Sequence, residues 1–350
     1  MWCHWLLLAS TILLAPSEIR RLERFRPLKH AALTRVTIDR EVNGACLQDV
    51  PEGLVDRYGL KITVSGWTPN EIDVRAQERR PLGAFIAELA PQMEASGAIT
   101  ESGVEFTINT VPESSEFDVG GTRRTAIVIP PTKNSKFDPP LVLVFHGHGG
   151  TARGAAERLQ IQSFWPEAVV VYPQGLPGVK GRTDPEGKLA GWQNNPGEFD
   201  DRDLKFVDKL LQEIQKSDKF DSKRVYAMGH SNGARFSAVL WKMRPDSFAA
   251  FCCCAGQGGL MIKDCQPKPI MMIAGEVDQL VPVTGQRMSM GLARMLLKAD
   301  PAKATTDGQA KIEPGIKGTE LVTYIHPGGH EFPKTALPVA VGFFRRHEKK

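Results

Sequence analysis

The sequence predicts an α/β fold, a mainly parallel sheet with helices on both faces, preceded by a small α+β module. Apolar runs alternate with amphipathic stretches from about residue 113 onward, and several runs are apolar throughout, as strands buried on both faces are. A cluster of Pro, Ser and Gly in residues 109–124 separates this region from a differently patterned one before it. The length of 350 residues exceeds what one hydrophobic core usually fills, so we expect two domains that meet near residue 113.

The first fifteen residues, MWCHWLLLASTILLA, hold an apolar run from Leu6 to Ala15. The run has the length of a signal-peptide core and is too short to span a bilayer. Ala15 and Ser17 form a small-residue cleavage site before Glu18, although no Lys or Arg precedes the run and five follow it in residues 20–29. We expect residues 1–17 to be a signal peptide and the protein to be secreted or periplasmic. An uncleaved membrane anchor and a misread start remain open.

Residues 18–112 are predicted to form the small α+β module. LKITVS (60–65), EIDVRA (71–76) and GVEFTI (103–108) have the composition of short strands, and PLGAFIAELAPQMEASG (81–97) has the periodicity of an amphipathic helix. The pattern loosely resembles the short modules at the N-terminus of secretins, without a diagnostic motif. Its role stays open, and binding of an envelope component or a polymer is the function that we consider for it.

Residues 113–350 alternate between predicted strands and predicted helices. The strands are expected at residues 124–130, 140–147, 167–173, 224–229, 248–256, 269–275 and 320–327, and the helices at 203–216, 232–243, 284–298 and 333–347. Residues 301–318 lack periodicity, which predicts a surface loop, with a lid near the site as the alternative. Cys252, Cys253 and Cys254 are expected in a buried strand, and a disulfide to Cys265 stays open.

One serine stands between two glycines in GHSNG, at Ser231. The predicted strand RVYAMG precedes it and the predicted helix NGARFSAVLWKM follows it, which is the setting that a nucleophile elbow requires. In such a turn a strained backbone lifts the hydroxyl above the sheet, and Gly229 and Gly233 carry no side chains that would collide with neighbouring elements. The first amides of the helix also point toward the place where an oxyanion would form. The pattern predicts Ser231 as a nucleophile.

A serine hydroxyl needs a general base, and that base needs a carboxylate to orient it. IMMIAGEVDQLVP supplies Asp278 and YIHPGGHEFP supplies His330, each just past the end of a predicted strand. The chain order of serine, acid and histidine is that of α/β-hydrolases. Glu276 competes with Asp278 and His326 competes with His330; we favour the later residue of each pair, because two glycines precede His330 and suit a turn that presents it.

Glycines also follow the buried run VLVFHGHGG. Backbone amides in such a turn can stabilise an oxyanion without reorganising, so we assign this role to the amides of His148 and Asn232. The alternatives are an ordinary strand-to-helix turn and metal binding by His146 and His148, and no carboxylate or cysteine lies close in sequence to support the latter. His230 adjoins the serine and is expected to pack beside the site.

From about residue 117 to 344 the chain resembles polyhydroxybutyrate depolymerase-like esterases, relatives of feruloyl and acetylxylan esterases. The motifs occur in family order: GGTRRTAIVIPP, PLVLVFHGHGG, VVVYPQG, GWQN, DDRDLKFVDKLL, the segment around GHSNG, KPIMMIAGEVDQLVP and GGHEFP. The resemblance implies an α/β-hydrolase fold, a catalytic set of Ser231, Asp278 and His330, and Trp192 as a wall of the acyl or aryl pocket. Within DDRDL, Asp203 is either the aligned acid or a helix N-cap, and we favour the cap.

Together these patterns predict a serine esterase that acts through an acyl-enzyme, with no metal or organic cofactor implied. The substrate is expected to be an ester that can be polymeric, such as a polyester or a plant polysaccharide ester. With 44 basic and 40 acidic residues the net charge is only +4, so nucleic acid is not an expected partner. Two alternatives stay open: a hydrolase of the same fold acting on peptides or lactones, and an inert protein that binds envelope or polysaccharide.

Overall fold

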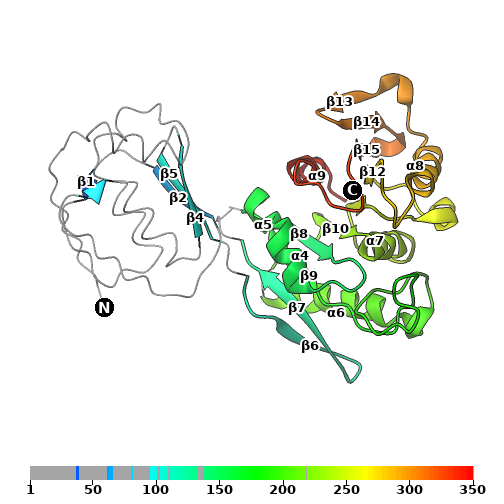
Figure 1. Ribbon diagram of the computed structural model, residues 1–350, viewed down its shortest axis with the longest axis horizontal. Coiled ribbons are helices and arrows are strands. Elements are labelled where there is room, and N and C mark those ends of the chain that lie inside the picture. Colours follow the sequence, from blue (N-terminus) through cyan, green and yellow to red (C-terminus); the bar gives the residue numbers. More distant parts are fainter. Residues whose placement is uncertain are drawn as a thin grey trace. The chain divides into compact units, whose positions relative to one another are not determined.

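The chain forms two compact units, residues 1–110 and 111–350, in the computed structural model (Figure 1). The structure describes five short strands of the first unit and residues 111–131, 137–217 and 219–349 of the second. The division lies close to residue 113, where the composition changes. The predicted signal peptide, residues 1–17, lies outside the described residues. Among the residues that are described, no helix is long and apolar enough to cross a membrane.

The described strands of the first unit form two small sheets. In one, β2 (Lys61–Ser65) pairs in parallel with β5 (Gly103–Ile108), which pairs antiparallel with β4 (Ala95–Thr100). In the other, β1 (Thr37–Ile38) and β3 (Arg80–Pro81) pair antiparallel. The strands expected at 60–65 and 103–108 are present, and the last residues of the helix expected at 81–97 lie in β4 instead. The strand expected at 71–76 lies outside the described residues.

The second unit is built on one sheet whose strand order is β13-β14-β15-β12-β11-β10-β8-β9-β7-β6. Its six central strands, β15, β12, β11, β10, β8 and β9, run parallel to one another, and antiparallel strands complete both edges. The strands are β6 (Ser115–Val119), β7 (Thr122–Ile129), β8 (Leu141–Phe145), β9 (Val169–Pro173), β10 (Val225–His230), β11 (Ala250–Cys254), β12 (Ile270–Gly275), β13 (Thr305–Asp307), β14 (Ala310–Pro314) and β15 (Glu320–His326).

Helices cover both faces of this sheet, as the sequence predicts (Figure 1). One face packs against α6 (Arg202–Ser217), α7 (Asn232–Met243) and α8 (Val283–Leu297), and the other against α4 (Ala152–Leu159), α5 (Ile161–Phe164) and α9 (Ala336–Arg345). Strand β8 shows how the two cores are divided: Leu141 and Leu143 point into the first and Val142 into the second. The strands read as uniformly apolar because both faces of the sheet are buried.

Residues 301–318 are neither a bare loop nor a lid, which corrects the sequence-based expectation. Strands β13 and β14 form a hairpin, and β14 pairs antiparallel with β15, so the segment extends the sheet at its edge. Hydrophobic periodicity is weak here because Glu313, a charged residue, is fully buried. Its carboxylate pairs with Arg294 of α8 and, at 2.8 Å, with Lys311.

The cysteine run lies in a buried strand, as expected. Cys252, Cys253 and Cys254 all belong to β11 and are free thiols. Cys265 is also buried and free, so the structure holds no disulfide to it, while Cys46 lies outside the described residues. Burial raises the pKa of the Cys253 thiol to about 12, which keeps it protonated and unreactive.

Candidate active site

Ser231 occupies a sharp turn between β10 and α7. Its backbone has φ 56° and ψ −116°, a conformation that a non-glycine residue adopts only under strain. Only glycine fits at positions 229 and 233, because the neighbouring backbones lie very close. A Cβ on Gly229 would come within 2.3 Å of Gly233, and a Cβ on Gly233 within 2.3 Å of the Phe145 carbonyl oxygen. The two glycines therefore have the steric role that the sequence predicts, and they leave the hydroxyl at the carboxyl edge of the sheet.

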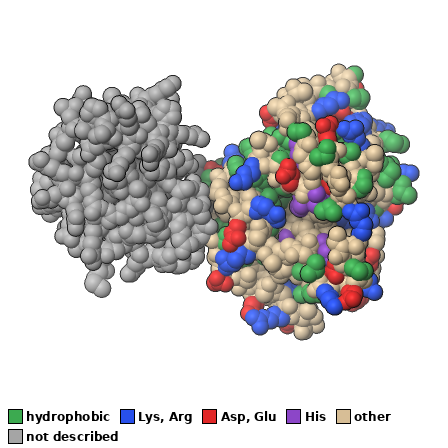
Figure 2. All heavy atoms as spheres, in the orientation of Figure 1, with side chains coloured by type: hydrophobic (Ala, Val, Ile, Leu, Met, Phe, Trp, Pro, Cys, Tyr) green, Lys and Arg blue, Asp and Glu red, His purple; other side chains and the backbone are tan. Residues whose placement is uncertain are grey.

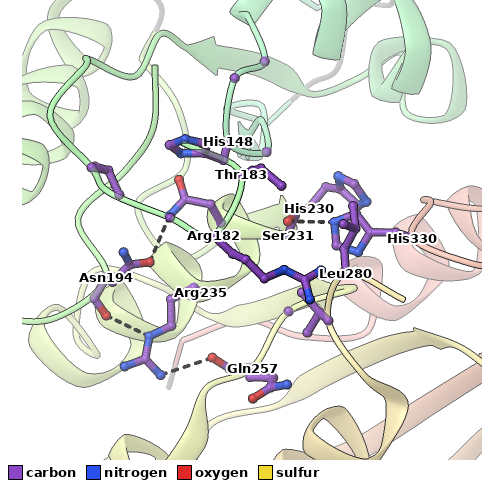
Figure 3. Close-up of a pocket in the computed structure, with 18 of the residues that line it drawn as sticks. His148, Arg182, Thr183, Asn194, His230, Ser231, Arg235, Gln257, Leu280 and His330 are labelled. Carbon is purple, nitrogen blue, oxygen red and sulfur yellow. Dashed lines mark hydrogen bonds between the residues drawn. The ribbon is translucent and has the colours of Figure 1, made fainter. Parts of the chain in front are cut away.

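The structure brings Ser231, His330 and Asp278 into one hydrogen-bonded chain. The Ser231 hydroxyl donates to Nε2 of His330 at 2.8 Å (Figure 3). Nδ1–H of His330 donates to Oδ2 of Asp278 at 2.8 Å. Asp278 follows β12 and His330 follows β15, two adjacent parallel strands, so both loops open at the same edge of the sheet. Glu276 points elsewhere and pairs with Arg287 at 3.6 Å.

Asp278 is held as an ionised carboxylate. Burial by itself would raise its pKa, but the amide of Val281 at 2.8 Å and the contact with His330 outweigh burial and lower the pKa below its usual value. Oδ1 also accepts from the amide of Leu280 at 2.9 Å, and Oδ2 accepts from the Gln286 side chain at 3.0 Å. The carboxylate thus keeps a fixed orientation and a negative charge toward His330 at neutral pH.

The two histidines that compete with His330 have other positions. His326 is buried at the end of β15, and its Nδ1 accepts from the Gly328 amide at 3.2 Å. His230 lies beside the site, with its ring centre 4.9 Å from that of His330, and burial lowers its pKa to about 4. Its Nε2 is buried with no hydrogen-bond partner in the described structure. Both therefore have the supporting positions that we expect, and His330 holds the bond to the serine.

The glycine turn after β8 is supported by a neutral histidine. Nδ1–H of His146 donates to the Gly147 carbonyl at 2.7 Å, and Nε2 accepts from the Gly175 amide at 3.0 Å. Burial lowers the pKa of His146 to about 4, so this tautomer persists at neutral pH. The His148 ring bonds Asp184 at 3.0 Å. In the described ranges no group of His, Cys, Asp and Glu could hold a metal ion.

Acidification is expected to destabilise the protein through His146. The pKa is about 4 in the folded chain against 6.5 for an ordinary histidine, so below pH 6.5 the unfolded chain binds a proton that the folded chain does not. This contribution to the free energy of unfolding is complete above pH 6.5 and is lost as the pH falls to 4, on the order of 3 kcal/mol for the one side chain. Urea unfolding at several pH values measures it, and His146→Gln should show a shallower pH dependence. An unchanged pH dependence in that variant would exclude this role.

The two residues whose amides the sequence assigns to the oxyanion lie at the same cavity as the serine. His148 and Asn232 line one cavity together with Ser231. Asn232 is the first residue of α7, where backbone N–H groups have no acceptor within the helix. The N-terminal end of the helix also carries partial positive charge. Stabilisation of an oxyanion by the His148 and Asn232 amides stays a prediction.

Trp192 does not line the pocket, which corrects the role that the resemblance implies. Its exposed fraction is 0%, because its ring packs against the rings of Phe145 and Phe236, with ring centres 5.1 Å and 5.4 Å away. The Trp192 backbone has a different part in the site: its N–H donates to Oδ1 of Asn232 at 2.7 Å, and its carbonyl accepts from Nδ2 at 2.9 Å. Trp192 thus fixes the Asn232 side chain from behind rather than touching a substrate.

Asp203 is neither a helix cap nor the acid of the site. It is the second residue of α6, fully buried, and pairs with Arg124 at 2.9 Å. Its other oxygen accepts from the Gln193 amide at 2.8 Å, next to Trp192. The buried ion pair therefore anchors the loop that holds Asn232, a contribution that the sequence shows only as the motif DDRDL.

A cavity of about 810 Å³ opens above Ser231 (Figure 3). Part of its wall comes from the loop after β9, through Val179, Arg182 and Thr183, and part from Leu280 and Val281 after β12. Arg182 reaches across and donates to the carbonyl of Gln279 at 3.2 Å. The hydrophobic periodicity of the sequence does not predict the shape of this loop. Isolated turns shape the loop, together with the buried side chain of Asp184, which accepts hydrogen bonds from two backbone amides.

Comparison with known proteins supports the fold. No family model matches the sequence. "Putative esterase NocK" of Nocardia uniformis subsp. tsuyamanensis is 28% identical over 199 residues, 54% of this chain and 52% of that protein, so the chain spans about half the length of this relative. "Probable feruloyl esterase C" of Aspergillus clavatus is 25% identical over 221 residues, 58% of this chain and 72% of that protein.

Two solved structures share the architecture of the second unit. An acetyl xylan esterase from Aspergillus awamori aligns with a TM-score of 0.51 and 13% identity, over 67% of this chain and 100% of that one. A thermostable esterase aligns with a TM-score of 0.50 and 16% identity, over 70% of this chain and 65% of that one. At this identity the likeness concerns the fold, and residues 111–350 have the α/β-hydrolase fold.

Proposed function

We propose that this protein is a serine esterase that hydrolyses carboxylic esters through an acyl-enzyme. The observation that carries the proposal is the continuous hydrogen-bonded chain from the Ser231 hydroxyl through His330 to Asp278, at the mouth of a cavity. A strained serine turn costs stability, and a protein that only binds a ligand has no need of it. The relatives named esterase and feruloyl esterase support the same reaction class.

We assign each proton transfer in this reaction to a side chain of the protein. His330 takes the proton of Ser231 at Nε2 while Oγ attacks the ester carbonyl, and Asp278 stabilises the imidazolium that forms. The amides of His148 and Asn232 bind the oxyanion of the tetrahedral intermediate. His330 then returns the proton to the leaving alcohol, and the acyl-enzyme remains. A water molecule, deprotonated by the same His330, releases the acid and restores the hydroxyl.

The natural ester and the place where the enzyme acts belong to the proposal as well. Feruloylated sugars, acetylated xylan and hydroxyalkanoate oligomers are the substrates that we propose from the relatives and from the motif resemblance, and aminoacyl amides or lactones are the alternative for the same residues. We further propose export through residues 1–17 and a polymer- or envelope-binding role for the N-terminal module. Sequencing the N-terminus of the mature protein tests the first, and pull-down on insoluble polymer tests the second.

Covalent labelling tests the proposed function directly. A fluorophosphonate should attach to Ser231 of the wild type, as located by peptide mass spectrometry, because the reagent requires an activated serine. The same preparation should hydrolyse at least one member of a panel of aryl esters, feruloylated sugars, acetylated xylan, hydroxyalkanoate oligomers and aminoacyl amides. Well-folded wild type that is neither labelled nor active on esters would favour the inert binding protein, and hydrolysis of the amides alone would favour a peptidase.

A further inference from the structure

Two cavities meet at the catalytic histidine. The first, of about 810 Å³, contains Ser231, and the second, of about 490 Å³, lies between α4 and the segment after His330. Both are lined by Gly147, Arg158, His230 and His330. Apolar side chains contribute to the second cavity, among them Leu159, Phe332 and Pro333. The two cavities therefore adjoin at these four residues.

The charge of the larger cavity is one-sided. Its described lining includes no Asp or Glu. Four cationic side chains line it: Arg158, Lys180, Arg182 and Arg235. The smaller cavity adds Lys334 and one acid, Glu331, which lies 3.9 Å from His326. Figure 2 shows histidine side chains near the centre of the coloured part, with both basic and acidic side chains on the surface around them. A cleft lined by one sign of charge attracts ligands of the opposite sign.

Of the cations that line the two cavities, the side chains of Arg158, Lys180 and Lys334 have no hydrogen-bond or ion-pair partner among the described residues, and of these three only Arg158 lines both cavities. Arg235 is occupied, since its guanidinium donates to the Asn194 carbonyl at 2.8 Å and to the Gln257 carbonyl at 3.1 Å. Arg182 donates to the Gln279 carbonyl. Arg158, in the last turn of α4, makes no hydrogen bond or ion pair with any residue that the structure describes.

Arg158 also stands close to the reacting groups. It lines both cavities, at the wall they share with His230 and His330. Burial lowers the pKa of His230, and the charges of His330 and Arg158 lower it further. The guanidinium thus acts on the same space that a bound ester would enter, where a neutral ligand would leave it unpaired.

We propose that the ester carries a carboxylate on its acyl half, bound by Arg158 where the cavities adjoin. This inference rests on the proposed serine esterase function and adds the substrate class to it. A guanidinium presents a planar pair of N–H donors that matches a carboxylate, and the positive wall of the larger cavity favours entry of the anion. The hydrocarbon between carboxylate and ester lies against the apolar side chains of the second cavity.

A matched pair of esters tests the proposal: monomethyl adipate, which ends in a carboxylate, and methyl hexanoate, which ends in a methyl group. The wild type should have a kcat/KM at least tenfold higher for the adipate, because a charge-assisted hydrogen bond forms only with that ester. Arg158→Gln should reduce this ratio tenfold or more, and Arg158→Glu should invert it. Arg287→Gln, which removes an exposed arginine outside both cavities, should keep the wild-type ratio.

Each outcome decides the proposal. A wild-type ratio near one, or a ratio that persists in Arg158→Gln, overturns it. If neither ester is turned over, the same pair is compared as inhibitors of 4-nitrophenyl acetate hydrolysis, and equal inhibition constants overturn it too. Failure of the esterase function looks different: the wild type would neither hydrolyse 4-nitrophenyl acetate nor react with a fluorophosphonate.

Discussion

Ser231→Ala is expected to lower kcat for ester hydrolysis by about 10⁶-fold, since removing the nucleophile of a triad costs as much as removing the whole triad. The hydroxyl is the only group that the substitution deletes, and the acceptor at Nε2 of His330 then has nothing to activate. The two backbone amides remain, so a residual rate of about 10³-fold to 10⁴-fold above the uncatalysed reaction should persist. Initial rates with 4-nitrophenyl acetate measure both the fall in kcat and the residual rate, at enzyme concentrations high enough to detect that residual rate.

The control for this substitution is folding. Alanine at position 231 retains the backbone conformation with φ 56°, and the amide of residue 231 still donates to the Cys254 carbonyl at 2.8 Å, so the urea midpoint should change little. Fluorophosphonate labelling should disappear together with activity. A folded Ser231→Ala protein that keeps activity within tenfold of the wild type would show that the reaction uses another nucleophile.

The catalytic residues were predictable because local patterns determine their positions. Ser231 needs only a strand, two glycines and a helix in succession, and all of these lie within twenty residues. Asp278 and His330 each follow an apolar strand, and parallel strands place their carboxyl ends at one edge whatever their order in the sheet. Their pairing required no knowledge of long-range packing. Their mutual distances, by contrast, come only from the structure.

Tertiary packing explains the predictions that were wrong. The resemblance implies that Trp192 is a pocket wall, yet its ring is buried against Phe145 and Phe236. Asp203 looked like a cap because it stands near a helix start, but its partner Arg124 is far away in the sequence. Residues 301–318 lacked an apolar alternation because Glu313 is buried as an ion pair. In each case a partner distant in the sequence determines the environment of the residue.

The sequence also did not predict which side chain supports the glycine turn after β8. His146 was considered only as a metal ligand, and the structure shows it bridging the Gly147 carbonyl and the Gly175 amide. A buried neutral histidine has no sequence signature, because the loop that supplies the Gly175 amide begins after a different strand. Arg158 was not predicted either, because its helix was not predicted. Only the structure shows that it lines two cavities at the site.

Asp278→Asn is expected to lower kcat by about 10⁴-fold while leaving the fold intact. Oδ1 of Asp278 accepts from the amides of Leu280 and Val281, so the asparagine carbonyl must take that position. The asparagine NH₂ then takes the place of Oδ2 and points at Nδ1 of His330. A donor there favours the tautomer with the proton on Nε2, which cannot accept the proton of the serine.

Gln286 reinforces this orientation of the asparagine only by losing a bond of its own. Its Nε2 donates both to Oδ2 of Asp278, at 3.0 Å, and to the Val281 carbonyl, at 2.7 Å, while its Oε1 is buried without a partner. Turning the amide would let Oε1 accept from the new NH₂, but the Val281 carbonyl would lose its donor. We therefore expect a moderate fall in the free energy of unfolding, about 1–3 kcal/mol, beside the large fall in kcat.

Two comparisons make the Asp278→Asn experiment decisive. Glu276→Gln changes an acid two residues away that pairs with Arg287, and should keep kcat within about twofold, because that side chain does not contact His330. The double variant with Ser231→Ala should be no slower than Ser231→Ala alone, since the carboxylate acts only through the histidine and serine. A further drop in the double variant would mean that Asp278 contributes to the reaction independently of them, and a loss below tenfold in the single variant would remove it from the mechanism.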